Sequence, residues 1–142
     1  MNSITHEEYE EAVHLMTGLA QTDTSGGRVA AQVVLSAYNG SEWQLDVADL
    51  SLLDGKYYLA AINVIRRRKE LMLEPHNLIA DGQEVFHRIW DQWNRYHISN
   101  RWKQTCFSCD GRGVIIEYDN HDRETRTPCR RCNKTGLIAE IS

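Results

Sequence analysis

The sequence lacks the features of a membrane-spanning, secreted or low-complexity chain. It has only two prolines and nine glycines among 142 residues, which leaves little material for a disordered linker. No apolar run approaches the roughly 18 residues that a membrane-spanning helix needs. Residues 1–8 contain neither the basic segment nor the apolar segment of a signal peptide. We therefore expect a compact intracellular protein of the cytoplasm.

Recognisable catalytic motifs are also missing. The sequence contains no glycine-rich phosphate loop, no serine nucleophile elbow and no helix with two zinc-binding histidines. Its histidines are scattered, and none stands beside a carboxylate at a catalytic spacing. Asp46, Asp49 and Asp54 are candidates for a metal-binding carboxylate cluster, but caps of short helical turns are the simpler interpretation. We expect a protein that is not an enzyme.

Charge and cysteine are distributed unevenly along the chain. The net charge is −4, but residues 1–98 hold eight Lys and Arg against fourteen Asp and Glu, whereas residues 99–142 hold eight against six. All four cysteines lie in the second stretch, and most long apolar runs lie in the first. This pattern predicts a cored domain at 1–98 and a module at 99–142 that is stabilised in another way. The acidity argues against broad coating of nucleic acid, which needs many contacts from Lys and Arg to phosphates, but leaves a local contact open.

Apolar periodicity predicts that the first domain is helical. Thr5 and Glu8 form a capping box ahead of apolar residues at three-to-four spacing, which indicates a helix that runs to about Leu19. Turn-forming residues predict a loop at 22–27, and the Ala, Val and Leu content of 28–38 predicts a second helix.

The rest of this domain predicts two further helices. Residues 43–47 alternate over a short span and are expected to be extended or a single helical turn. Asp54 caps a third helix that ends before Pro75, because the residue before a proline avoids helical angles. Asp81 and Glu84 form the cap signal of a fourth helix. The third helix is expected to bury one apolar face, made of Tyr58, Ala61, Ile62, Ile65 and either Leu71 or Met72.

The strongest motif is a pair of CxxC sequences. Cys106 and Cys109 form the first, Cys129 and Cys132 form the second, and nineteen residues separate them. Two thiolates on one tight turn can reach a single tetrahedral ion, and a second such turn completes the shell. Four sulfur ligands satisfy Zn²⁺ and leave no position for water or substrate. We therefore expect one zinc ion with a structural role.

The segment between the two motifs predicts a β-hairpin. Residues 114–118 form a strand, 119–122 a turn, and 123–128 return antiparallel to the first strand. Because this module has few apolar residues, metal binding should supply about 10–16 kcal/mol of apparent binding energy that also drives its folding. The expected fold is mainly α: a small helical domain followed by a C-terminal zinc-bound β-hairpin module.

Other uses of four cysteines fit the sequence less well. Stable disulfides are disfavoured in a cytosolic chain. A thioredoxin-like redox site needs one CxxC at a strand–helix junction and not two that flank a hairpin. An iron–sulfur centre also takes four cysteines, although paired knuckles suit zinc better. Zinc is therefore the favoured ligand, with the iron–sulfur alternative kept open.

Glycines after the cysteines add a resemblance to a known family. Residues 106–113 match the motif CxxCxGxG, and residues 129–136 match it with Lys134 in place of the first glycine. The chain thus resembles half of the DnaJ-type cysteine-rich zinc domain, which has four such repeats and two zinc ions. It has no His-Pro-Asp tripeptide of a J domain. Residues 104–138 are also similar to the two-knuckle finger of lambda-type antitermination Q proteins of phages.

The helical domain carries a second resemblance. Residues 31–40, 43–50, 58–66 and 74–76 resemble an uncharacterised domain family found in bacteria, phages and plasmids. The likeness covers about residues 26–96 and implies a bacterial or mobile-element origin, with no activity to carry over. The expected location is the cytoplasm of a bacterial cell or of a phage-infected host.

Together these features predict a regulatory or adaptor protein, phage- or mobile-element-encoded. Its zinc module would bind a host protein, the transcription complex or nucleic acid. Because a zinc tetrathiolate carries −2, some nearby cations serve only to balance it. One alternative is a phage inhibitor of a host defence protein that acts through the acidic helical body, and another is an enzyme. The candidate partner-binding residues around the knuckles are Trp102, Lys103, Arg112, Arg126, Arg130, Arg131 and Lys134.

Overall fold

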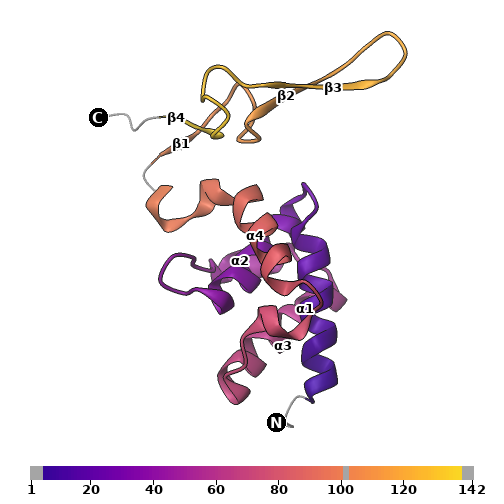
Figure 1. The fold of residues 1–142 in the computed structure, drawn as a ribbon, viewed down its shortest axis with the longest axis vertical. Coiled ribbons are helices and arrows are strands. Elements are labelled where there is room, and N and C mark those ends of the chain that lie inside the picture. The colour runs from indigo at the N-terminus through magenta and orange to yellow at the C-terminus, as the bar shows by residue number, and fades with distance from the viewer. Residues whose placement is uncertain (1–4, 101–102, 139–142) are drawn as a thin grey trace. The chain divides into compact units, whose positions relative to one another are not determined.

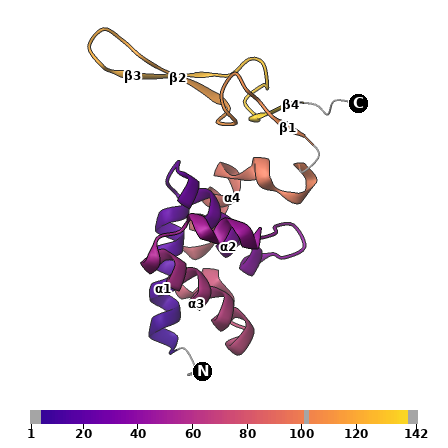
Figure 2. The same ribbon diagram turned by 180° about the vertical axis from the view of Figure 1, so that it is seen from behind.

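The chain divides into two compact units, a helical unit (Met1–Asn94) and a cysteine-rich unit (Arg95–Ser142), in a computed structural model that describes residues 5–100 and 103–138. The sequence placed this boundary slightly later, between residues 98 and 99. Helices make up the first unit and an antiparallel hairpin dominates the second (Figures 1 and 2), so the predicted mainly α fold with a small C-terminal hairpin is confirmed. Within the described ranges, no helix combines the length and apolar character needed to cross a bilayer.

The helical unit is built around helix α1, which packs against both α2 and α3. Short 3₁₀ turns connect the later helices, and one of them, η2, packs against α4. The elements are α1 (His6–Ala20), α2 (Ser25–Tyr38), η1 (Val47–Leu52), α3 (Gly55–Leu71), η2 (Pro75–Leu78) and α4 (Gly82–Gln92). Two further 3₁₀ turns, η3 (Asn94–Tyr96) and η4 (Ile98–Asn100), follow.

Large aromatic side chains fill the core of the helical unit. Tyr9 and Trp93 are almost completely buried, yet each has a partner for its polar atom. The Tyr9 hydroxyl donates to the carbonyl oxygen of Leu73 at 2.9 Å, and Trp93 Nε1 donates to that of Ala20 at 2.6 Å. Burial raises the pKa of Tyr9 to about 12, so this hydroxyl stays a donor. Each ring therefore adds apolar area to the core without leaving a polar atom unsatisfied.

The starts of α1 and α2 follow local capping chemistry. The Thr5 side chain accepts from the Glu8 amide and the Glu8 carboxylate accepts from the Thr5 amide, which confirms the predicted capping box. The predicted loop at 22–27 is wrong in its second half, because α2 begins at Ser25. The side chain of Thr24 accepts from the Gly27 amide and caps the helix three residues earlier than expected.

The three aspartates at 46, 49 and 54 do not gather into a metal site. Asp46 accepts from the Ala48 amide at 3.0 Å and caps η1, as the capping interpretation predicted. The Asp49 carboxylate instead binds the Gln32 amide group of α2 at 3.2 Å. Asp54 precedes α3 but makes no side-chain capping bond. In the described residues, the four cysteines are the group identified as able to hold a metal ion.

The predicted buried face of α3 is wrong in part. Ala60, Ala61 and Val64 are buried, whereas Tyr58 and Ile65 are exposed. Small side chains permit a close approach of the helices that pack on α3, and bulky side chains one position away are left outside. The predicted and the observed faces of α3 overlap at Ala61. Which of the two is buried depends on the neighbouring helices and not on hydrophobicity alone.

After η4, the cysteine-rich unit is built from two short antiparallel strand pairs. Strand β1 (Gln104–Thr105) pairs with β4 (Leu137–Ile138), and β2 (Val114–Tyr118) pairs with β3 (Glu124–Pro128). These bounds confirm the hairpin predicted between the CxxC motifs. Asp119 organises its tip, since the carboxylate accepts from the amides of His121 and Arg123 at 2.8 and 2.9 Å. These N–H groups hold the pKa of Asp119 below its ordinary value.

Candidate metal centre

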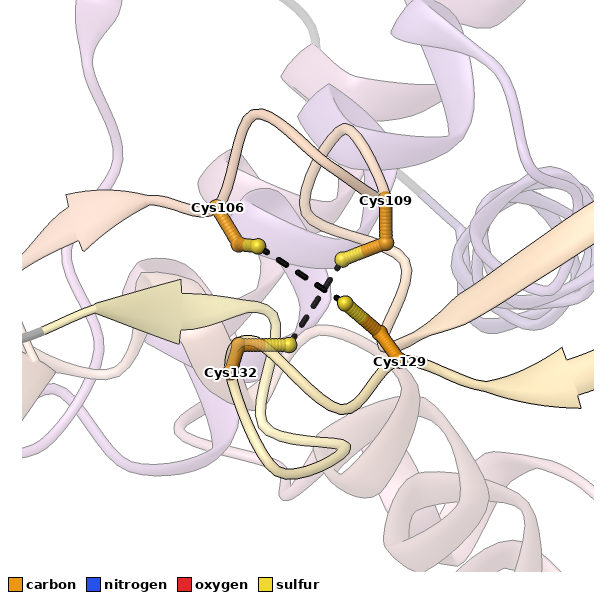
Figure 3. A group of neighbouring side chains, drawn as sticks. All are labelled: Cys106, Cys109, Cys129 and Cys132. Atoms are coloured by element: carbon orange, nitrogen blue, oxygen red, sulfur yellow. Dashed lines mark hydrogen bonds between the residues drawn. The ribbon is translucent and has the colours of Figure 1, made fainter.

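Four cysteine sulfurs converge at one point of the cysteine-rich unit (Figure 3). All four Sγ atoms lie within 4.8 Å of one another. The Sγ atoms of Cys106 and Cys129 are 3.8 Å apart, and those of Cys109 and Cys132 are 3.6 Å apart. Sulfurs placed about 2.3 Å from a tetrahedral ion are about 3.8 Å from one another. The spacing therefore fits a single four-coordinate ion.

The same spacing excludes disulfides. A disulfide needs sulfurs about 2.05 Å apart, well below the separations found here. All four cysteines are free and buried, with exposed fractions from 0% to 5%. Four buried cysteines this close together can all be thiolates only if a cation compensates their charge. The donor set therefore fits a soft or borderline metal ion.

The two CxxC motifs adopt the same backbone conformation. In each motif, three residues after the second cysteine have positive φ, at the first, second and fourth positions. The angles are 54°, 80° and 79° in the first motif and 54°, 68° and 77° in the second. The residues concerned are Asp110, Gly111 and Gly113, and then Asn133, Lys134 and Gly136. The sequence repeat is thus also a structural repeat.

Backbone amides of this repeat point at the sulfurs. The Gly113 amide donates to Cys109 Sγ and the Gly136 amide donates to Cys132 Sγ, both at 3.2 Å. An N–H group directed at a sulfur stabilises the thiolate over the thiol. Each motif therefore supplies its own backbone hydrogen bond that favours the thiolate, the form that a metal ion binds.

The two motifs also bind one another. The Cys129 amide donates to the Gly113 carbonyl, and the Cys106 amide donates to the Gly136 carbonyl, both at 2.9 Å. The contact is close enough that a Cβ on Gly113 would lie 2.5 Å from the Lys134 carbonyl oxygen. Glycine is therefore required here for space as well as for its positive φ. The two turns form one cradle with the four sulfurs at its centre.

The surroundings of the cysteines shift their acidities in opposite directions. Burial opposes ionisation of Cys106, but the amides of Cys109 and Ser108 outweigh it and hold the pKa of that thiol at about 7, below the ordinary 9.0. Burial raises the pKa of Cys109 to about 11. A metal ion must therefore displace protons when it binds, so its affinity falls as the pH is lowered.

Replacement of Lys134 by glycine is expected to tighten metal binding. A non-glycine residue at φ 68° carries about 1–2 kcal/mol of backbone strain. The greater freedom of glycine in the unfolded chain offsets about 0.5–1 kcal/mol of the relief. The net gain of about 1 kcal/mol corresponds to about fivefold in affinity, measurable by competition with a chromogenic chelator. Lys134→Gln is the control for the lost charge, and equal affinities of the two variants would contradict the argument.

The predicted partner-binding residues differ in their environments. Arg112 pairs with Asp110 at 3.7 Å, and Arg126 pairs with Glu124 at 3.3 Å. Lys103 Nζ donates to the side chain of Asn100 at 3.1 Å. The prediction for Trp102 lies outside the described residues. The remaining three, which are exposed on the second CxxC turn, are Arg130, Arg131 and Lys134.

Arg131 has a contact that spacing alone did not predict. Its guanidinium carbon lies 4.0 Å from the ring centroid of Phe107, which is 69% exposed. The two residues come from different CxxC turns, and the folded cradle brings them together. A guanidinium over an aromatic face is a cation–π pair. This pair, together with Arg130 and Lys134, is named the knuckle surface below.

Comparison with known proteins identifies the helical unit. A family model described as a family of unknown function (DUF7673) matches residues 10–94, which is more than half of the chain. The expectation of an uncharacterised domain family for this part of the chain is confirmed, and the match extends further toward the N-terminus than residue 26. The match ends before the first cysteine. No curated protein and no solved structure matches the chain.

Proposed function

The chain belongs to the DUF7673 family, whose function is unknown, and we propose that it is a non-enzymatic regulatory or adaptor protein. In this proposal a structural Zn²⁺ holds the knuckle surface in a fixed shape for a macromolecular partner. The observation that carries the proposal is the closed shell of four sulfurs, since an ion with four protein ligands has no open position for catalysis. The exposed knuckle surface is the part of the module that the ion orders most directly.

We propose a protein as the first candidate partner. The cysteine-rich half of the sequence, residues 99–142, has eight basic against six acidic residues, and a zinc tetrathiolate of −2 cancels that excess. Arg112 and Arg126 already have carboxylate partners. A module of nearly zero net charge lacks the strong field that nonspecific binding to nucleic acid requires. An exposed arginine–aromatic pair is instead typical of the residues that dominate protein interfaces.

Nucleic acid is the second candidate, favoured by one observation. Arg131 over the Phe107 ring offers both a cation and an aromatic face at one point. Proteins that bind single strands combine such groups, because bases stack on aromatic rings while cations follow the phosphates. We further propose that the protein is of bacterial or phage origin and that its target is the transcription complex.

The replacement of Arg130 and Arg131 by alanine is expected to weaken partner binding about tenfold, as the loss of one strong interface arginine would. Zinc-loaded full-length protein is used to capture partners from a bacterial lysate, with and without nuclease, and the captured proteins are identified by mass spectrometry. Retention after nuclease indicates a protein partner, and loss indicates nucleic acid. For nucleic acid, the double variant should also lower the slope of log affinity against log salt by about 2.

The matched control removes the same charge from the helical unit. Lys69→Ala with Arg88→Ala changes two exposed basic residues of α3 and α4 and should leave capture unchanged. The proposal would be overturned if the double variant of Arg130 and Arg131 still captured the partner and the helical-unit control did not. That result would instead favour an inhibitor that acts through the helical unit.

A further inference from the structure

The helical unit has a pocket that the metal centre and its proposed function do not use. Its volume is about 430 Å³, within the range of small-molecule sites. Three aromatic residues, Tyr38, Phe86 and Trp90, line it together with Asn39, His87 and two carboxylates, Glu42 and Asp91. The residues come from the end of α2, the segment after it and α4. The pocket therefore combines aromatic side chains with two acidic groups.

The aromatic rings form a corner. The rings of Tyr38 and Trp90 lie at 87° to one another with centroids 6.4 Å apart. Tyr38 also contacts Phe86, with centroids 5.3 Å apart. Behind this wall, the buried ring of Trp43 packs against Trp90 at 5.1 Å and holds its orientation. The arrangement of Tyr38 and Trp90 is T-shaped, so that the edge of one ring lies toward the face of the other.

The electrostatics of the pocket also favour a cation. Asn39 donates its side-chain amide to the Glu42 carboxylate and orients it after the end of α2. Tyr38 is the last residue of this helix, so the negative end of the helix dipole lies at the pocket. The guanidinium of Arg68 binds the Ala37 carbonyl and is not among the lining residues.

We propose that this pocket binds an organic ammonium group, methylated at nitrogen. Aromatic side chains with nearby carboxylates attract a cation whose charge is spread over methyl groups, because such a cation loses little hydration when it enters an aromatic-lined pocket. A bare metal ion fits less well, because the acidic lining residues are not among the described groups whose ligand atoms lie close enough together to hold one. The group comes either from a free amine such as choline or from a methylated lysine side chain of another protein.

The test is a titration of ¹⁵N-labelled, zinc-loaded full-length protein, followed through the tryptophan indole signals. The signal of Trp90 is assigned with a Trp90→Phe variant. The probes are choline, its uncharged isostere 3,3-dimethylbutan-1-ol, and a peptide with trimethyl-lysine. We expect a saturable shift of the Trp90 signal with choline and at least tenfold weaker binding of the isostere. Tighter binding of the peptide than of choline would identify a protein as the source of the group.

Variants separate the pocket from general charge effects. Asp91→Asn and Glu42→Gln should each weaken choline binding by about threefold or more, because each removes a carboxylate that lines the pocket. Glu84→Gln makes the same charge change at an exposed site of α4 that does not line the pocket, and it should bind choline as the parent does. No saturable shift, or equal binding of choline and the isostere, would overturn the proposal.

Discussion

Removal of the metal ion is expected to unfold the cysteine-rich unit and leave the helical unit folded. The core of the cysteine-rich unit is a cluster of the four cysteines, and among the residues that the structure describes Ile115 and Ile138 are the partly buried apolar side chains packed against it. That apolar area cannot offset the ordering of the chain, so the bound ion must supply most of the folding free energy, about 10–16 kcal/mol for a structural zinc site. The helical unit has its own aromatic and aliphatic core and needs no ion.

The measurement is an NMR spectrum of the full chain before and after dialysis against a strong chelator. We expect the amide signals of β2 and β3 to collapse to random-coil positions, while the signals of α1 to α4 stay in place. Cys109→Ser should reproduce the chelated spectrum in the presence of zinc, since three thiolates no longer close the shell. Persistence of the hairpin signals without metal would contradict the assignment of a structural ion.

Acid should have the same effect as the chelator. Protons compete with the ion for the thiolates, and the Cys106 thiol, with a pKa of about 7, is the first of the two shifted cysteines to ionise as the pH rises. Stability from metal binding is therefore present at high pH and declines as the pH falls, because each thiolate that takes up a proton is lost as a ligand. With cobalt in place of zinc, release of the ion can be followed directly, because the sulfur-to-cobalt charge-transfer absorption disappears when the ion leaves the thiolates.

The parts of this molecule that local chemistry determines were predictable from sequence. Thr5 and Glu8 bind each other's amides three residues apart, so their pattern specifies a helix start without reference to the rest of the chain. The CxxC pairs behave similarly, because a tight turn places both sulfurs on one ion. Residues with positive φ occur at the same three positions of both motifs. The spacing of the glycines in the sequence already indicated that repeat.

The parts that depend on packing between distant segments were not predictable. On α3, the choice between the stripe of Ala61 and Val64 and the stripe of Tyr58 and Ile65 depends on which helices approach. The pocket lined by Tyr38 and Trp90 joins residues of α2 and α4 that are about fifty positions apart, and no local pattern connects them. The pair of Arg131 and Phe107 likewise needs the folded cradle.

Replacement of Gly82 by alanine is expected to destabilise the helical unit by about 3 kcal/mol, the upper part of the usual range for overpacking. The predicted cap by Asp81 at the start of α4 is wrong, since Asp81 makes no side-chain capping bond. Gly82 is buried, and a Cβ there would overlap the His76 carbonyl oxygen and lie 2.7 Å from its carbon. Close contact with η2, and not a cap, therefore sets where α4 begins.

The cost is large because both elements that would have to separate carry core residues. Helix α4 buries Phe86 and Ile89, and η2 buries Leu78. A backbone carbonyl cannot rotate away as a flexible side chain can, so the new methyl group must displace one whole segment. Thermal unfolding of the zinc-loaded protein, followed by circular dichroism of the helices, should show a Tm lower by about 15 °C.

Gly18→Ala is the matched control. Gly18 lies within α1, and a Cβ there would meet no atom within 4 Å. The same chemical change should therefore stabilise the helix by about 0.5–1 kcal/mol, because alanine loses less conformational freedom on folding than glycine. The two variants add the same methyl group and should shift the Tm in opposite directions. Equal shifts would show that helix propensity alone governs both sites, and that α4 does not depend on its contact with the His76 carbonyl.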